Sequence, residues 1–88
     1  MGVRLDGDII RLEGDCAVDE AEVLLTLLQT APARMVDLSL CRHPHAAVVQ
    51  VLLGFAGGVR GVNEDAFIER WLTPALIRAV ADRPDVGL

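Results

Sequence analysis

The sequence predicts a small α/β domain in which helices pack against one small mixed β-sheet, in the order β-β-α-β-α-(β)-α. Three observations lead to this expectation. Short β-prone runs flank an Asp6-Gly7 pair, apolar residues recur at helical spacing further along the chain, and a mostly apolar strand-like run separates the first two helical segments. A chain of 88 residues holds one modest core, so we expect a single domain over residues 1–88.

The first two strands are predicted to form a hairpin. Asp6-Gly7 separates residues 3–5 from residues 8–13, and an Asp-Gly pair suits the positive φ angles of a two-residue turn. The Gly-Asp pair at residues 14–15 is expected to end the second strand.

An amphipathic helix is expected to follow from Asp19 to Gln29. Asp19 and Glu20 place negative charge at its beginning, where the helix dipole favours it. Its apolar side chains have the spacing of a core-facing stripe: Val23, Leu24, Leu27 and Leu28. Pro32 marks the end of this helix.

The next strand and helix form the centre of the predicted fold. Residues 35–40 make a mostly apolar strand between two helices, and we therefore expect it at the centre of the sheet. Residues 41–43 are predicted to form a turn, and Pro44 suits the first position of the following helix. That helix, residues 46–55, is nearly all apolar, and the glycines at its end are expected to stop it.

The last third of the chain is predicted to add a short strand or loop at residues 59–62 and two helices. Asn63 is expected to cap the first helix, whose apolar stripe is Phe67, Ile68, Trp71 and Leu72. Pro74 lacks an amide donor and predicts a break, after which a second short helix ends at Ala81. Residues 83–88 are expected to be a frayed tail.

The composition excludes several classes of function. Thirteen acidic and eight basic residues give a net charge of −5, and the basic residues are scattered, so we expect no nucleic-acid surface. The most apolar stretch, residues 46–59, is shorter than the roughly 20 residues of a membrane span. With no signal-peptide pattern at the beginning, this predicts a cytoplasmic protein whose cysteines, Cys16 and Cys41, are reduced.

The chain is apolar for its length. Apolar residues make up 52% of it, and its mean hydropathy is +0.41. A domain of this size leaves part of such a surface exposed. Exposed apolar patches often mark sites for another protein or a second copy, and scattered exposed apolar residues are the alternative.

The polar residues between Ser39 and His45 are candidates for chemistry. Cys41, His43 and His45 are zinc-ligand types, but ligands so close in sequence cannot easily converge on one ion, and we expect no metal. Ser39 lies in a strand predicted to be buried and lacks a matched base. The glycines after residue 53 follow a helix, whereas a phosphate loop precedes one. We therefore predict no catalytic residue, no cofactor and no enzyme activity.

The beginning of the helix after Pro44 is the predicted binding site. A helix N-terminus carries unpaired amide groups and the positive end of the helix dipole. The two histidines there either recognise an acidic group of a partner or simply cap the turn. The residues assigned to partner binding are Arg42, His43, His45, Ala46 and Gln50.

Several short segments share a pattern with a known family. Residues 10–14 read Ile-Arg-Leu-Glu-Gly, residues 36–39 read Val-Asp-Leu-Ser, and residues 45–53 are an apolar run that begins His-Ala-Ala. Together with the helix at residues 19–29, they resemble the STAS domain of bacterial anti-sigma factor antagonists and of sulfate-transporter tails. The resemblance covers residues 9–53, half of the chain, and continues more weakly beyond.

The resemblance implies a non-catalytic, regulatory docking domain. Switchable antagonists carry a phosphorylatable serine at the beginning of this helix, which gains about −1.5 to −2 charges. His45 and Ala46 occupy the matching positions, so we expect no phosphorylation switch there. The implied partner is a bacterial protein, with an anti-sigma-type kinase or a transporter ATPase as candidates. The alternative is a small accessory subunit of a larger enzyme or transporter complex.

Overall fold

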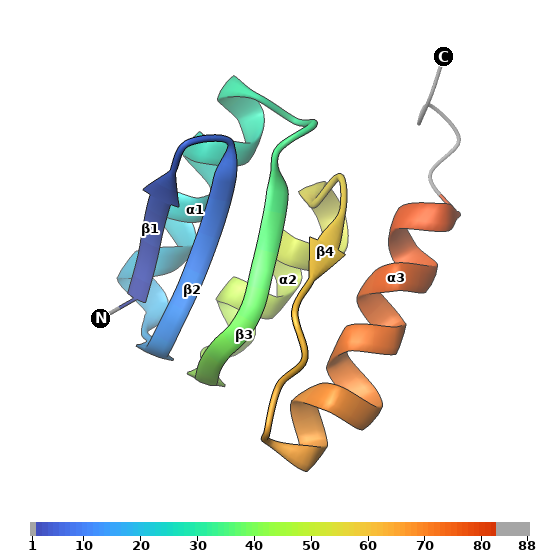
Figure 1. Ribbon diagram of the computed structural model, residues 1–88. Helices are drawn as coiled ribbons and strands as arrows, with labels where there is room; N and C mark the ends of the chain where they lie inside the picture. Colours follow the sequence, from blue (N-terminus) through green and yellow to red (C-terminus); the bar gives the residue numbers. More distant parts are fainter. Residues whose placement is uncertain (1, 83–88) are drawn as a thin grey trace.

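The computed structural model describes residues 2–82 and confirms the predicted α/β class (Figure 1). The predicted tail, residues 83–88, lies outside the described residues. The elements in chain order are β1 (Gly2–Asp6), β2 (Ile9–Cys16), α1 (Val18–Thr30), β3 (Met35–Pro44), α2 (Ala46–Phe55), β4 (Val59–Arg60), the π-helical turn η1 (Ile68–Leu72) and α3 (Thr73–Ala81).

The strands form one mixed sheet in the order β1-β2-β3-β4. β1 and β2 are antiparallel, whereas β2 and β3 are parallel to each other, as are β3 and β4. Crossovers between parallel strands are right-handed in nearly all proteins, so two that advance in the same direction place their helices on the same face. Figure 1 shows α1 and α2 behind one face of the sheet and α3 beside the β4 edge.

The core lies between that sheet face and the helices. Alternate residues of β2 and β3 point into it, which leaves the other residues of these strands on the open face. The principal buried side chains are Ile10, Leu12, Val36 and Leu38 from the sheet, Leu24, Leu28, Val48 and Leu52 from α1 and α2, and Ile68, Leu72 and Leu76 from η1 and α3. Val23, Phe67 and Trp71, which were predicted in core stripes, are exposed instead.

The hairpin turn lies one residue later than predicted. Asp6 pairs with Ile9, so the two central residues are Gly7 and Asp8. Gly7 has a φ of +61°, and no non-glycine residue among the described ones has a positive φ. A single glycine at the first central position is the pattern of a type II′ turn. The Asp6-Gly7 pair predicted positive φ angles at both central residues, which is a type I′ turn.

β2 and β3 both extend beyond their predicted ends. The expected turn at residues 41–43 is wrong, because Cys41 pairs with Gly14 and Pro44 pairs with Cys16 along the ladder. Two register shifts absorb extra residues of β3 along this ladder, one between Arg11 and Glu13 and one after Gly14, which adopts a φ of +66°. Pro44 is therefore the last residue of a strand rather than the first residue of α2.

The expected helix break at Pro74 is also wrong. The Thr73 amide donates to the carbonyl of Ile68, five residues earlier, and α3 continues directly from η1. This widened turn places Pro74 in the first turn of α3, where its missing amide donor is tolerated. Between residues 2 and 82, no helix has both the length and the hydropathy to cross a membrane.

Candidate functional site

The five residues predicted to bind a partner lie at the end of β3 and the beginning of α2. Arg42 and His43 belong to the last part of β3, His45 is the N-cap of α2, and Ala46 and Gln50 lie in its first two turns. All five are exposed. Ala46 and Gln50 are four residues apart, so they share one face of the helix.

His45 caps α2, which was one of the two roles considered for it. The amide of Ala47 donates to His45 Nδ1 over 3.0 Å. The backbone amide of His45 donates to the carbonyl of Cys16 over 2.8 Å, which ties the beginning of α2 to the end of β2. The chain itself therefore satisfies one of the amide groups at this helix N-terminus.

The two other polar side chains near this helix beginning differ in their surroundings. His43 Nδ1 lies 2.8 Å from Asp15 Oδ1, and both side chains are 77% exposed, so this contact adds little stability. Arg42 is exposed and forms no ion pair within residues 2–82. Its guanidinium group is therefore free to bind a carboxylate of another molecule.

The outer face of α2 is apolar. The helix has ten residues and no charged side chain, and within Ala46–Phe55 only Val48 and Leu52 are buried. Leu53 is 39% and Phe55 46% exposed. Surface helices of globular proteins normally turn charged or polar residues outward. This helix therefore presents apolar surface where a solvated helix would carry charge.

A shallow apolar groove of about 420 Å³ runs between α1 and α2. We call it the α1–α2 groove. Gln50 lies on it, which connects the groove with the predicted binding residues. Its lining residues are Val18, Ala21, Glu22 and Leu25 from α1, and Ala47, Gln50, Val51 and Phe55 from α2.

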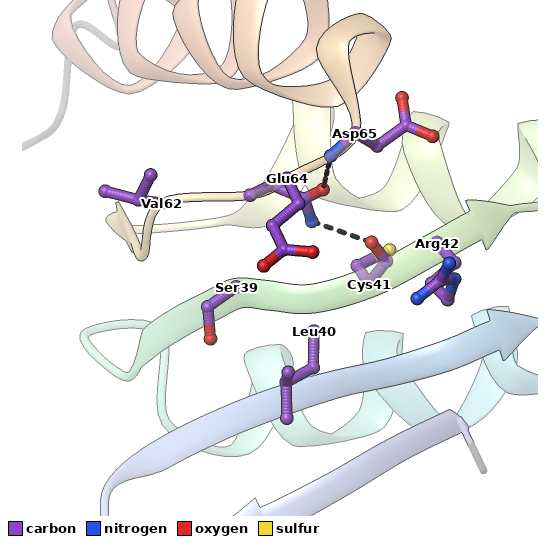
Figure 2. Close-up of a pocket in the computed structure, with 8 residues that line it drawn as sticks. Ser39, Leu40, Cys41, Arg42, Val62, Glu64 and Asp65 are labelled. Carbon is purple, nitrogen blue, oxygen red and sulfur yellow. Dashed lines mark hydrogen bonds between the residues drawn. The ribbon is translucent and has the colours of Figure 1, made fainter.

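A second hollow of about 460 Å³ lies beside the latter half of β3 (Figure 2). It forms because β4 ends at Arg60 and pairs only with Val36 and Asp37, so the edge of β3 beyond them faces a loop. The hollow is lined by Ser39, Leu40, Cys41, Arg42, Val62, Asn63, Glu64 and Asp65. The sequence did not predict this hollow, because its presence depends on how early β4 ends.

Asn63 has a different role from the helix cap that was predicted. It is buried, and its Nδ2 donates to the carbonyls of Leu38 and Cys41 over 2.6 and 2.7 Å. Its side chain thus replaces the missing strand at the edge of β3. Asp65 caps the helix instead, because its Oδ1 accepts hydrogen bonds from the amides of Phe67 and Ile68 over 2.9 and 3.3 Å.

The candidates for metal binding do not converge. Among the described residues, no group of three or more His, Cys, Asp or Glu side chains is arranged to hold a metal ion. Cys41 is buried in the core, whereas His43 and His45 are exposed. A hydrogen bond with the Cys16 thiol, together with burial, raises the pKa of Cys41 far above its ordinary value, so it remains a thiol at neutral pH.

Ser39 lies on the open face of the sheet and is half-buried. Its hydroxyl donates to Asp37 Oδ1 over 2.6 Å. Burial alone would raise the pKa of Asp37, but hydrogen bonds from Ser39 and the charges of Arg11 and Arg60 outweigh it and hold the pKa below its ordinary value. A carboxylate of lowered pKa is a weak general base. This pair therefore gives little activation of the serine.

No protein-family model, curated protein or solved structure matches the chain. The described residues define a small α/β protein with a four-stranded mixed sheet and helices on one face and one edge.

Proposed function

We propose that this chain is a non-catalytic protein-interaction domain of STAS type, which docks on a bacterial partner protein through the end of β3 and the outer face of α2. The observation that carries this proposal is the uncharged outer face of α2. Apolar surface of this kind is poorly solvated, and its burial against another protein is favourable. The partner-binding residues are those predicted above: Arg42, His43, His45, Ala46 and Gln50.

The topology supports the STAS assignment. A hairpin, a helix, a strand of sequence Val-Asp-Leu-Ser and an apolar helix follow one another in the order expected of that family. The helix beginning holds His45 and Ala46, neither of which has a hydroxyl group. The docking is therefore proposed to act without serine phosphorylation at this position, and an anti-sigma-type kinase or a transporter ATPase remains the candidate partner.

The exposed guanidinium group of Arg42, which has no ion-pair partner within residues 2–82, supports a polar contribution to docking. A planar guanidinium binds carboxylates through two parallel hydrogen bonds, which fixes orientation as well as adding affinity. The proposed surface thus combines an apolar helix face with one cation near its rim. This division resembles the apolar centre and polar rim of many protein interfaces.

A permanent place in a larger enzyme or transporter complex is the second candidate. The observation in its favour is that the three aromatic residues of the chain, Phe55, Phe67 and Trp71, are 46%, 66% and 69% exposed. Two of them lie in the last helical segment rather than on α2. An accessory subunit would be covered on more than one face, and it would behave poorly when purified alone.

The proposed function is tested by locating the partner at the surface and then weakening it there. Benzoylphenylalanine in place of Ala46 photocrosslinks the partner in cells, and mass spectrometry identifies it. Binding of the purified partner is then measured by calorimetry for the wild type and for Gln50→Arg. A charge placed within a desolvated apolar contact is expected to weaken binding about tenfold or more.

Thr30→Arg is the control, because Thr30 is exposed on α1 and lies off the helix face that lines the α1–α2 groove. It should bind as the wild type does. The proposal is wrong if Gln50→Arg binds with unchanged affinity, or if Ala46 yields no crosslinked protein.

A further inference from the structure

We propose that the α1–α2 groove receives an amphipathic helix with basic side chains, contributed by the partner protein. This inference rests on the proposed function and specifies the chemistry of the segment that docks. Three features of the groove lead to it: its shape, its lack of backbone partners and its charge.

The shape of the groove suits a third helix. The residues that α1 contributes are spaced i, i+3, i+4 and i+7, and those of α2 are spaced i, i+3, i+4 and i+8. Each set therefore follows one face of its helix. Ala21 is buried and Ala47 half-buried, so small side chains form the floor, while the exposed Val18 and Phe55 stand higher. Such a furrow between two helices accepts the side-chain ridge of another helix.

Between the ends of its two helices, the groove offers side chains rather than free backbone groups to pair with. Its two walls are helices, whose amide and carbonyl groups are bonded within each helix away from the ends. An extended peptide would place unpaired backbone groups against an apolar lining, which is unfavourable. A helix satisfies its own backbone and can bury one apolar face. The occupant is therefore a helix rather than a strand.

The charge around the groove selects a basic occupant. α1 carries Asp19, Glu20 and Glu22 and no basic residue, and α2 carries no charge at all. Asp19 and Glu22 are exposed, and Glu22 lines the groove. Glu20 instead faces β1, where it accepts a hydrogen bond from the amide of Val3 over 2.7 Å. Lysine or arginine side chains beside the apolar face of the docked helix would complement Glu22 and Asp19.

A second copy of this chain fits the same surface poorly. A two-fold dimer would join the same patch on both copies. Such an interface would bring the groove-lining Glu22 carboxylates of the two copies together without a cation from α1 or α2. Like charges brought together across an interface disfavour association, so the groove favours a different protein.

The first test compares photocrosslinking from two positions. Benzoylphenylalanine replaces Val18, which is 57% exposed on the groove, or Ala46, which is exposed and does not line the groove. Replacement of Asp8 in the hairpin turn is the control. From Val18, we expect a crosslink to a partner segment with helical apolar spacing and several lysine or arginine residues.

The outcomes of the crosslinking separate the inference from the proposed function. A crosslink from Ala46 without one from Val18 retains the proposed function and overturns the inference. A crosslink from Val18 to an acidic segment, to a proline-rich extended segment or to a second copy of this chain also overturns it. If neither position gives a crosslink, the inference and the proposed function are both wrong.

The second test uses a synthetic peptide with the sequence of the crosslinked segment. We compare its affinity for the wild type, Glu22→Lys and Glu64→Lys by fluorescence titration. Both substitutions change the net charge by the same amount, and Glu64 is exposed outside the groove. Glu22→Lys is expected to weaken binding about tenfold and Glu64→Lys less than twofold. Equal effects of the two variants, or no effect of Glu22→Lys, would show that the groove charge does not select the peptide.

Discussion

At the scale of single residues, Asp37 joins three strands on the open face of the sheet. Its Oδ1 accepts hydrogen bonds from the amide and the hydroxyl of Ser39, at 2.8 and 2.6 Å. Its Oδ2 lies 3.1 Å from Arg11 Nη1 of β2 and 3.4 Å from Arg60 Nε of β4. The residue is only 5% exposed, so its carboxylate is shielded from water, although the Arg60 side chain is 54% exposed. We therefore assign Asp37 a structural role.

Asp37→Asn should lower the free energy of unfolding by about 1–3 kcal/mol, because it removes charge-assisted hydrogen bonds from a buried group. Urea denaturation at pH 7 measures this loss. Asp8→Asn, in the exposed hairpin turn, is the matched control and should change stability by less than about 0.5 kcal/mol. If Asp37→Asn unfolds at the same urea concentration as the wild type, the structural role assigned to this carboxylate is wrong.

The same residue predicts a dependence of stability on pH. Because its folded-state pKa lies below the ordinary 3.8, the ionised carboxylate stabilises the fold above that pH. This stabilisation is lost as the pH falls through the folded-state pKa. The difference in unfolding free energy between the wild type and Asp37→Asn should therefore shrink below about pH 4. A difference that grows on acidification would contradict the lowered pKa.

Asn63 acts as a second single-residue connection, between β3 and the last helix. Asn63→Ala leaves the carbonyls of Leu38 and Cys41 without this donor and should lower the unfolding free energy by about 1–3 kcal/mol. Thermal unfolding followed by circular dichroism measures the effect. Glu64→Ala, at the exposed neighbouring position, should unfold like the wild type. If the two variants have the same melting temperature, the amide does not support the β3 edge.

At the scale of elements, β4 is held close to β3 by a glycine. Gly61 has a φ of +100°, and a Cβ atom there would lie 2.8 Å from the amide nitrogen of Ser39 and 2.9 Å from Asp37 Oδ1. A side chain would therefore be strained in its own backbone and would press on the Asp37 contacts. Gly54 differs in both respects, since it is helical and a Cβ atom would meet open space.

Two alanine substitutions should consequently have opposite effects. Gly61→Ala is expected to lower the unfolding free energy by about 1–3 kcal/mol through backbone strain and the close contact. Gly54→Ala should raise it by about 0.5–1 kcal/mol, because alanine favours the helix. Urea denaturation of both variants checks the signs, and a gain in stability from Gly61→Ala would show that the loop after β4 adapts freely.

The elements also show what could be predicted from the sequence. Local signals identified the hairpin, α1, β3 and α2, because an Asp-Gly pair and apolar periodicity act within a few residues. The end of β3 could not be predicted, since Pro44 remains in the strand only because Cys16 of β2 lies beside it. The continuous helix through Pro74 likewise depends on the widened turn at η1, for which the sequence carries no recognisable signal.

Less of the candidate site than of the fold could be predicted from the sequence. The five residues around the beginning of α2 are exposed, as a binding role requires, and the capping by His45 was one of two interpretations. The α1–α2 groove was not predicted, because it depends on how two helices pack side by side. Asn63 was assigned to the wrong helix position, since only the folded chain places it beside the carbonyls of β3.

At the scale of the whole molecule, the described core contains aliphatic side chains and two cysteines, and the aromatic residues lie on the surface. Trp71 is 69% exposed and is the single tryptophan of the chain. Iodide should therefore quench its fluorescence in the folded protein nearly as effectively as in urea. The Stern–Volmer constants in the two conditions give the comparison.

Protein concentration provides the control for this measurement. If Trp71 is shielded from iodide at high concentration and becomes accessible on dilution, a second copy covers η1. Shielding that persists at all concentrations would contradict the exposed position of the side chain.

The order of the strands in the sheet has a consequence for synthesis on the ribosome. The spatial order β1-β2-β3-β4 is also the order in which the strands are made. Each new strand can therefore add to an existing edge, and none of the four has to insert between two strands that are already paired. The pairing of β2 with β3 must still wait until α1 has been made, because that helix connects the two strands. We expect the nascent chain to gain its first stable sheet only when Pro44 has left the exit tunnel.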